Sequence, residues 1–91
     1  MFRSFMDELL IYLIENEIPH WSTEEMDGFL SIFIFDKDAH KKRKKCKDVY
    51  VPYLRVSHFD LEKPYTRYNG VCDHMTKEQI FNIVDELGGL N

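Results

Sequence analysis

The segment 29–35 reads Phe-Leu-Ser-Ile-Phe-Ile-Phe and constrains the fold more than any other part of the chain. It is too short for a typical helix and is rich in residues that favour β-strands. Alternate residues of a strand point to opposite faces of a sheet, so one face carries Phe33 and Phe35 and the other is aliphatic. A strand that is apolar on both faces is normally central or covered on both sides. We therefore expect a sheet with helices packed against it.

Two segments near the ends of the chain repeat apolar residues at helical spacing. In 4–17 they recur at i, i+3 and i+4, and Ser4 precedes them as a potential N-cap. In 76–87, Thr76 and Gln79 have the spacing of a capping box, and an apolar stripe follows them. Each helix has one apolar stripe to bury, so both are expected to pack on the sheet.

Other segments predict the rest of the sheet. Residues 49–57 have the composition of a second strand, in which Pro52 indicates an edge position or a bulge because proline donates no hydrogen bond. Residues 65–68 predict a short third strand that ends at the Asn69-Gly70 turn. A capping-box spacing that begins at Ser22 predicts a short helical turn over 23–27.

Together these segments predict one α+β domain over 1–91. Its sheet is expected to be short and antiparallel, with two or three strands flanked by an N-terminal and a C-terminal helix in the order α-β-β-(β)-α.

A block of positive charge interrupts this otherwise acidic chain. Half of its twelve Lys and Arg lie in the block, and the six that remain face sixteen Asp and Glu, so the rest of the chain has a formal charge of −10. We expect a basic hairpin loop over about 37–48. This loop binds phosphates, binds an acidic groove of another protein, or is only solvated. The six cations are Lys41, Lys42, Arg43, Lys44, Lys45 and Lys47.

Two further sets of residues are candidates for binding. If both helices cover the same face of the sheet, the other face presents aromatic rings to a partner or to a base. This aromatic set comprises Phe33, Phe35, Tyr50 and Tyr53. Carboxylates on and beside the first helix form an acidic surface of the kind that can replace phosphates at a basic cleft. This acidic set comprises Asp7, Glu8, Glu15, Glu17, Glu24 and Glu25.

Enzymatic and metal sites have little support in the sequence. It contains no glycine-rich phosphate loop, nucleophile elbow or metalloprotease helix signature, so we expect no enzyme, cofactor or metal. The one enzymatic alternative is a metal-dependent nuclease that uses Asp36, Asp38 and His40. Without a secretory signal, an apolar run of about 18 residues or a dense cysteine framework, we expect a cytoplasmic protein that does not insert into a membrane.

The sequence leaves three functions open. The first is a small protein-interaction module, in particular an inhibitor or modulator of nucleic-acid-handling machinery whose acidic surface imitates phosphate. The second is an RNA- or DNA-binding protein that contacts phosphates through residues 41–47. The third is a structural homo-oligomer in which the basic block of one chain meets the acidic helix of the next.

Overall fold

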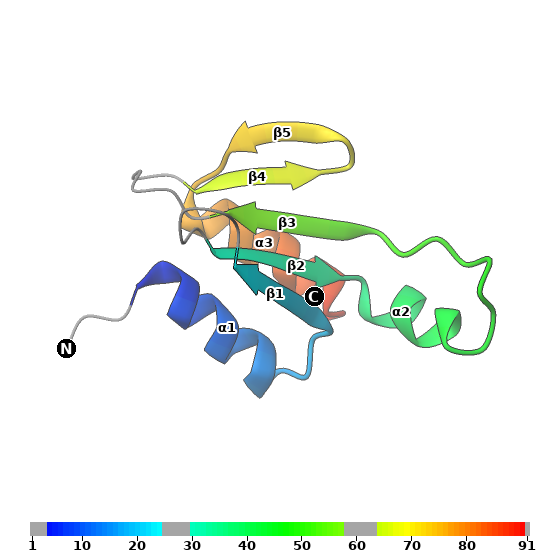
Figure 1. Cartoon of the computed structure of the whole chain (residues 1–91). Coiled ribbons are helices and arrows are strands. Elements are labelled where there is room, and N and C mark those ends of the chain that lie inside the picture. The colour runs from blue at the N-terminus through cyan, green and yellow to red at the C-terminus, as the bar shows by residue number, and fades with distance from the viewer. Residues whose placement is uncertain (1–3, 25–29, 58–63, 91) are drawn as a thin grey trace.

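The computed structural model describes residues 4–24, 30–57 and 64–90. In these ranges the chain forms three helices and a five-stranded antiparallel sheet whose strands lie side by side in chain order (Figure 1). The α+β class is confirmed, but the expected size of the sheet is wrong because β1 and β5 were not predicted. The elements are α1 (Phe5–Glu15), β1 (His20–Glu24), β2 (Leu30–Phe35), α2 (Lys37–Arg43), β3 (Tyr53–Ser57), β4 (Tyr65–Tyr68), β5 (Val71–His74) and α3 (Lys77–Leu87).

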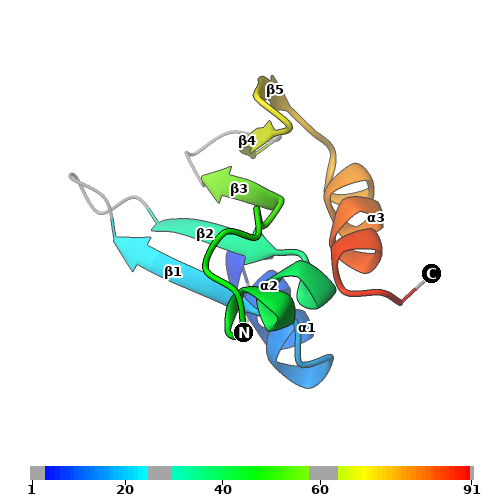
Figure 2. The same cartoon turned by 90° about the vertical axis from the view of Figure 1, so that its right-hand side faces the viewer.

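Helices α1 and α3 lie on the same side of the sheet (Figure 2). Their apolar stripes meet the aliphatic face of β2 and β3 in one hydrophobic cluster. The two helices also contact each other, because the ring of Phe81 meets those of Phe5 and Tyr12 edge-on at 5.8 and 5.1 Å between centroids. The fully buried members of the cluster include Leu9, Leu13, Ile32, Ile34, Leu54, Val56, Ile80 and Val84.

The predicted N-caps of both helices are confirmed. Ser4 caps α1, and Thr76 and Gln79 form the full capping box of α3, with the Gln79 N–H donating to Thr76 Oγ1 at 3.1 Å. After α1, the Ile18 N–H donates to the Leu13 carbonyl at 2.9 Å, as in a Schellman motif. Glu17 takes the left-handed position of that motif with a φ of 53°.

The predicted helical turn over 23–27 is wrong in its described part, because Ser22 and Thr23 belong to β1. This strand pairs along its whole length with β2, with Ser22 opposite Ile32. A complete ladder of backbone hydrogen bonds outweighs a single side-chain cap. Residues 25–27 lie outside the described residues.

Strand β3 is central rather than an edge strand. It begins at Tyr53 and pairs with β2 on one side and β4 on the other. Pro52 precedes the strand, so its missing N–H removes nothing from the ladder, and its carbonyl accepts a hydrogen bond from the Asp36 N–H at 2.9 Å.

The predicted third strand is confirmed as β4, and its turn leads into the unexpected β5. Asn69 and Gly70 have φ angles of 52° and 78°, the left-handed pair that a two-residue hairpin requires. All four residues of β5 are exposed, so the strand lacks the apolar alternation that would have indicated it.

The basic segment begins with helix α2, whereas the sequence predicted a loop over 37–48. The Asp36 carboxylate caps this helix by accepting a hydrogen bond from the Ala39 N–H at 2.8 Å. Lysine and arginine are good helix formers, and cations are favourable in a last turn. No residue of α2 is buried, and the helix extends beyond the end of the sheet (Figure 1).

Candidate functional site

The two faces of the sheet differ because α1 and α3 cover only one of them (Figure 2). Directly paired residues on neighbouring strands point to the same face, so the register assigns each strand residue to a face. We call the side opposite α1 and α3 the open face. Its strand residues, of which Ser31 and Ser57 are buried, are Trp21, Thr23, Ser31, Phe33, Phe35, Tyr53, Arg55, Ser57, Tyr65, Arg67, Cys72 and His74.

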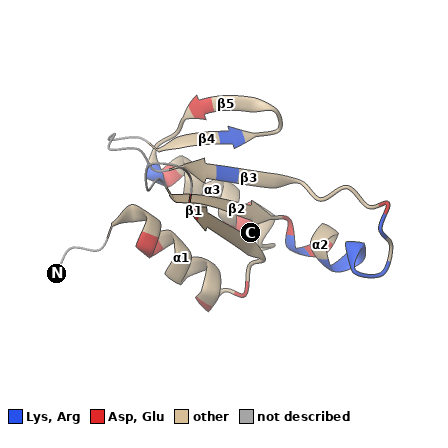
Figure 3. Cartoon of the chain, in the orientation of Figure 1, with Lys and Arg blue, Asp and Glu red and all other residues tan. Residues whose placement is uncertain are grey.

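The charged side chains that the described strands place on the open face are two arginines. Arg55 and Arg67 lie directly opposite each other on β3 and β4. The carboxylates of the described strands, Glu24 and Asp73, belong to the face that the helices share. Figure 3 shows Lys and Arg on β3, β4, α2 and the start of α3, and Asp and Glu along α1, on β5 and beside α2. Arg67 is exposed and Arg55 is half-buried, and no carboxylate of the described strands belongs to the open face.

Aromatic rings lie beside these arginines. Trp21, Phe33 and Arg55 are successive neighbours across three strands, and Trp21 is 64% exposed. The guanidinium carbon of Arg55 lies 5.4 Å from the centre of the Phe33 ring, a cation–π distance. The ring centroid of Tyr53 lies 6.0 Å from that of Phe33 and 6.4 Å from that of Phe35. These rings offer flat apolar surfaces next to positive charge.

A cavity of about 480 Å³ lies where the open face meets α2, and we call it the aromatic pocket. The ring of His40 stacks on that of Phe35 at 6.0 Å, with 23° between the planes. Tyr50 is 73% exposed, and with Tyr53 and Arg67 it also lines a smaller hollow of about 160 Å³. The aromatic pocket is lined by Phe35, His40, Arg43, Tyr50, Val51 and Tyr53.

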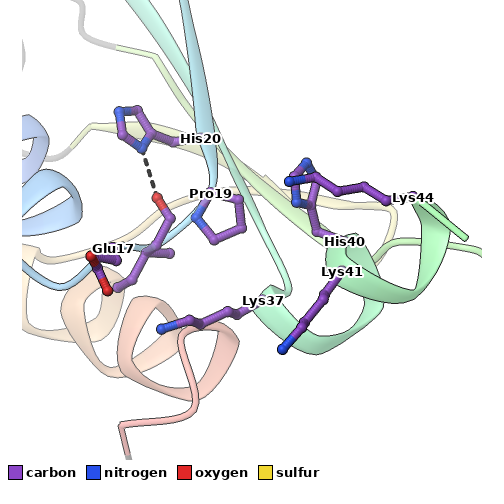
Figure 4. A pocket seen from close by; sticks show the side chains of 8 residues that line it. Glu17, Pro19, His20, Lys37, His40, Lys41 and Lys44 are labelled. Atoms are coloured by element: carbon purple, nitrogen blue, oxygen red, sulfur yellow. Dashed lines mark hydrogen bonds between the residues drawn. The ribbon is translucent and has the colours of Figure 1, made fainter.

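A second cavity, of about 470 Å³, lies between α2 and the connection from α1 to β1 (Figure 4), and we call it the lysine pocket. Lys37, Lys41 and Lys44 are spaced so that they share one face of α2. Opposite them, the Nδ1 atom of His20 lies 2.8 Å from the Ile18 carbonyl oxygen. The pocket is lined by Glu17, Ile18, Pro19, His20, Lys37, His40, Lys41 and Lys44.

Near β5, the open face carries titratable groups that influence one another. A hydrogen bond with the Cys72 side chain is the main cause that raises the pKa of Tyr65, and the charges of Arg67 and Arg55 oppose that rise. The rings of Tyr65 and His74 meet edge-on at 5.3 Å between centroids. Cys46 and Cys72 are both exposed free thiols.

The six cations predicted as a basic loop are all exposed but do not act as one group. Lys41 and Lys44 line the lysine pocket, and Arg43 lines the aromatic pocket. The other three, Lys42, Lys45 and Lys47, line neither of these pockets.

The carboxylates predicted as an acidic surface lie mainly on α1. Asp7, Glu8 and Glu15 are exposed on that helix, and Glu24 is exposed at the end of β1. Glu17 instead lines the lysine pocket. Glu25 lies outside the described residues. The structure therefore leaves most of these carboxylates on the helical side and brings one of them to the lysines.

Three of the four predicted aromatic residues, Phe33, Phe35 and Tyr53, lie on the open face. Tyr50 precedes β3 and joins two of these rings in the aromatic pocket. Sequence reasoning missed Trp21 and the Arg55–Arg67 pair. Trp21 directly precedes the segment that the sequence predicted as a helical turn, and the arginines were missed because neither belongs to a charge run.

Lys37 and His40 were also missed as binding residues. Their spacing to Lys41 and Lys44 would have grouped them on one side of a helix, had a helix been predicted there. His40 and Asp36 had been considered for a metal-dependent nuclease, but the Asp36 carboxylate caps α2 and the His40 ring stacks on Phe35. In the described ranges, no group of three or more His, Cys, Asp or Glu side chains is arranged to hold a metal ion.

None of the helices that the structure describes is both long and apolar enough to cross a membrane. Comparisons of the chain with protein-family models, curated proteins and solved structures found no match of any of these three kinds.

Proposed function

We propose that this chain is a non-enzymatic binding protein for single-stranded nucleic acid. The strand lies across the open face, where bases stack on Trp21 and on the rings around Tyr53. Its phosphates are neutralised by Arg55 and Arg67 and, at the end of the sheet, by the cations of α2.

The observation that carries this proposal is the arrangement of the open face. There the exposed Trp21 and the half-buried rings of Phe33, Phe35 and Tyr53 lie beside two arginines, and the described strand carboxylates belong to the other face. Single-stranded nucleic acid requires this combination, because its bases stack on aromatic rings while its backbone attracts cations.

A single strand suits this surface better than a duplex. In a duplex the flat faces of the bases are stacked on one another, so aromatic rings on a sheet can reach only the backbone and the groove edges. The acidic surface of α1 lies on the other side of the molecule and repels phosphates from it (Figure 3). The charge separation therefore favours one orientation of the protein on the strand.

Fluorescence anisotropy with labelled single-stranded RNA, single-stranded DNA and duplex DNA tests the proposal. At about 50 mM salt we expect micromolar or tighter binding of single strands, which weakens at about 200 mM salt. Changing both arginines, Arg55→Gln with Arg67→Gln, should reduce the slope of log affinity against log salt by about 0.7 for each lost phosphate contact. Trp21→Ala should cost about 1–3 kcal/mol, the usual contribution of one stacked base.

Two variants on the helical side serve as matched controls. Lys77→Gln removes one positive charge at α3, where the ammonium lies 5.5 Å from the Phe5 ring centre. Ile14→Ala removes an apolar side chain that is 64% exposed on α1. Both should leave affinity unchanged within twofold, an approximate limit that corresponds to about 0.4 kcal/mol. If these controls lose as much affinity as the open-face variants, the open face is not the binding surface.

The acidic surface of α1 supports a second candidate, the protein-interaction module that imitates phosphate. Asp7, Glu8 and Glu15 are exposed there and available to a basic partner. Reversing two acids, Glu15→Lys with Glu17→Lys, should abolish binding of an arginine-rich protein but not weaken binding of a single strand. A head-to-tail homo-oligomer would instead appear as a larger species in size-exclusion chromatography at low salt and dissociate at high salt.

A further inference from the structure

The aromatic pocket and the lysine pocket adjoin because His40 lines both. Its ring stacks on Phe35, so this one side chain separates an apolar, ring-lined cavity from one lined by ammonium groups. A nucleotide has the same division, with a flat base at one end and a phosphate at the other. The two pockets thus offer complementary surfaces to the two ends of one nucleotide.

The charge of the lysine pocket distinguishes between kinds of phosphate. Its three ammonium groups and the carboxylate of Glu17 leave a formal charge of +2. An internal phosphodiester carries one negative charge, whereas a phosphomonoester has a second pKa of about 6 and carries nearly two at pH 7. The pocket therefore matches a terminal phosphate better than one within the strand.

The lysines of this pocket are available to an anion. No ion pair joins Lys37, Lys41 or Lys44 to a carboxylate within the described part of the chain. Figure 4 shows Glu17 on the opposite side of the pocket from Lys37, Lys41 and Lys44.

We propose that α2 holds a phosphorylated end of the bound strand, with the terminal phosphate in the lysine pocket and the terminal base in the aromatic pocket. This assignment rests on the nucleic-acid binding proposed above and adds the part of the strand that α2 recognises. Arg43 lines the aromatic pocket and adds a positive charge beside the base. Glu17 reduces the attraction of the lysine pocket for anions.

The test compares one oligonucleotide in three forms, with a 5′-phosphate, a 3′-phosphate or hydroxyls at both ends, by competition against a labelled strand. One phosphorylated form should bind on the order of tenfold more tightly than the hydroxyl form, as expected for one additional charge met by several ammonium groups. Lys41→Gln with Lys44→Gln should remove this preference. Lys42→Gln with Lys45→Gln loses the same charge outside both pockets and should keep it.

Glu17→Gln provides a gain-of-function variant that a folding defect cannot imitate. It removes the carboxylate of the lysine pocket, so it should increase affinity for the phosphorylated end by about threefold or more, while affinity for the hydroxyl form changes less. Circular dichroism of each variant checks that it is folded.

Several results would overturn the assignment. Equal affinity for all three forms would refute end recognition while leaving strand binding in place, whereas no binding of any form would refute the proposed function itself. If both double-lysine variants lose the preference for the phosphorylated form equally, the net charge of the protein, and not the lysine pocket, determines that preference. If inorganic phosphate at the concentration of the oligonucleotide erases the preference, the pocket binds a free anion and not a strand end.

Discussion

Gly88, which ends α3, has no room for a side chain. A Cβ atom built there would lie 2.7 Å from Ile18 Cδ1 and 2.8 Å from Ile18 Cγ1. Carbon atoms are at their optimal separation at about 3.5–4.0 Å, so Gly88→Ala forces a displacement of close to 1 Å. Ile18 is only 2% exposed and cannot move out into solvent. The substitution should therefore destabilise the contact between α3 and the connection from α1 to β1.

Two opposing effects set the magnitude. Overpacking of a core costs about 1–3 kcal/mol. The φ of Gly88 is −82°, which alanine adopts without strain. Alanine also lowers the conformational entropy of the unfolded chain, which stabilises the folded state by about 0.4–1 kcal/mol. We expect a net loss of about 1–2 kcal/mol in the free energy of unfolding. For a domain of this size each kcal/mol lowers Tm by roughly 4–8 °C.

A double-mutant cycle with Ile18→Val measures the Cδ1 part of the clash. That change removes Cδ1, keeps Cγ1 and alone costs about 0.5–1.5 kcal/mol. Combined with Gly88→Ala, it should cost about 1 kcal/mol less than the sum of the two single changes, as measured by urea denaturation.

Gly89→Ala is the matched control for this cycle. Gly89 has a φ of 69° and no atom within 4 Å of an added Cβ, so alanine there should destabilise by backbone strain alone and show no coupling to Ile18. Additive costs for Gly88 and Ile18, or equal coupling for Gly89, would refute the packing argument.

Three further predictions concern stability. The Ser31 and Ser57 hydroxyls are buried and 3.0 Å apart, so Ser31→Ala should cost about 1–3 kcal/mol and the double alanine variant less than the sum in urea denaturation. A hydrogen bond from the Tyr12 hydroxyl to Asp85 raises the pKa of Tyr12. The stability that this hydrogen bond adds to the fold is fully present below about pH 10 and is lost as the pH rises above it. In thermal melts, Tyr12→Phe should be less sensitive than wild type to pH above 10. Glu17→Gly should stabilise by about 0.5 kcal/mol in urea because it relieves a left-handed backbone.

The helices and the central strand could be predicted because local signals and tertiary packing agree there. Ser4 and Thr76 cap helices whose apolar stripes face the sheet, and 29–35 includes the most apolar strand. Strand β5 could not be predicted, because it is an exposed edge strand held by pairing with β4 and not by burial. Helix α2 was missed because charge was interpreted as a loop signal, although Asp36 caps the segment.

The candidate site could be predicted only in part. The cationic and aromatic residues could be identified from the sequence, but the strand register decides which of their side chains become neighbours. Arg55 and Arg67 become neighbours only through the pairing of β3 with β4. Trp21 joins Phe33 only through β1, a strand that the sequence did not indicate.

The most direct test of the open face uses Trp21, the single tryptophan of the chain. Its indole is exposed on that face, so its intrinsic fluorescence reports a base that stacks there. Titration with a single-stranded oligonucleotide at low salt should quench this emission to saturation, and neither a duplex nor the Arg55→Gln, Arg67→Gln variant should reproduce the effect at the same concentration. Unchanged emission while the strand binds, or equal quenching by the duplex, would contradict the assignment of the open face as a platform for single-stranded nucleic acid.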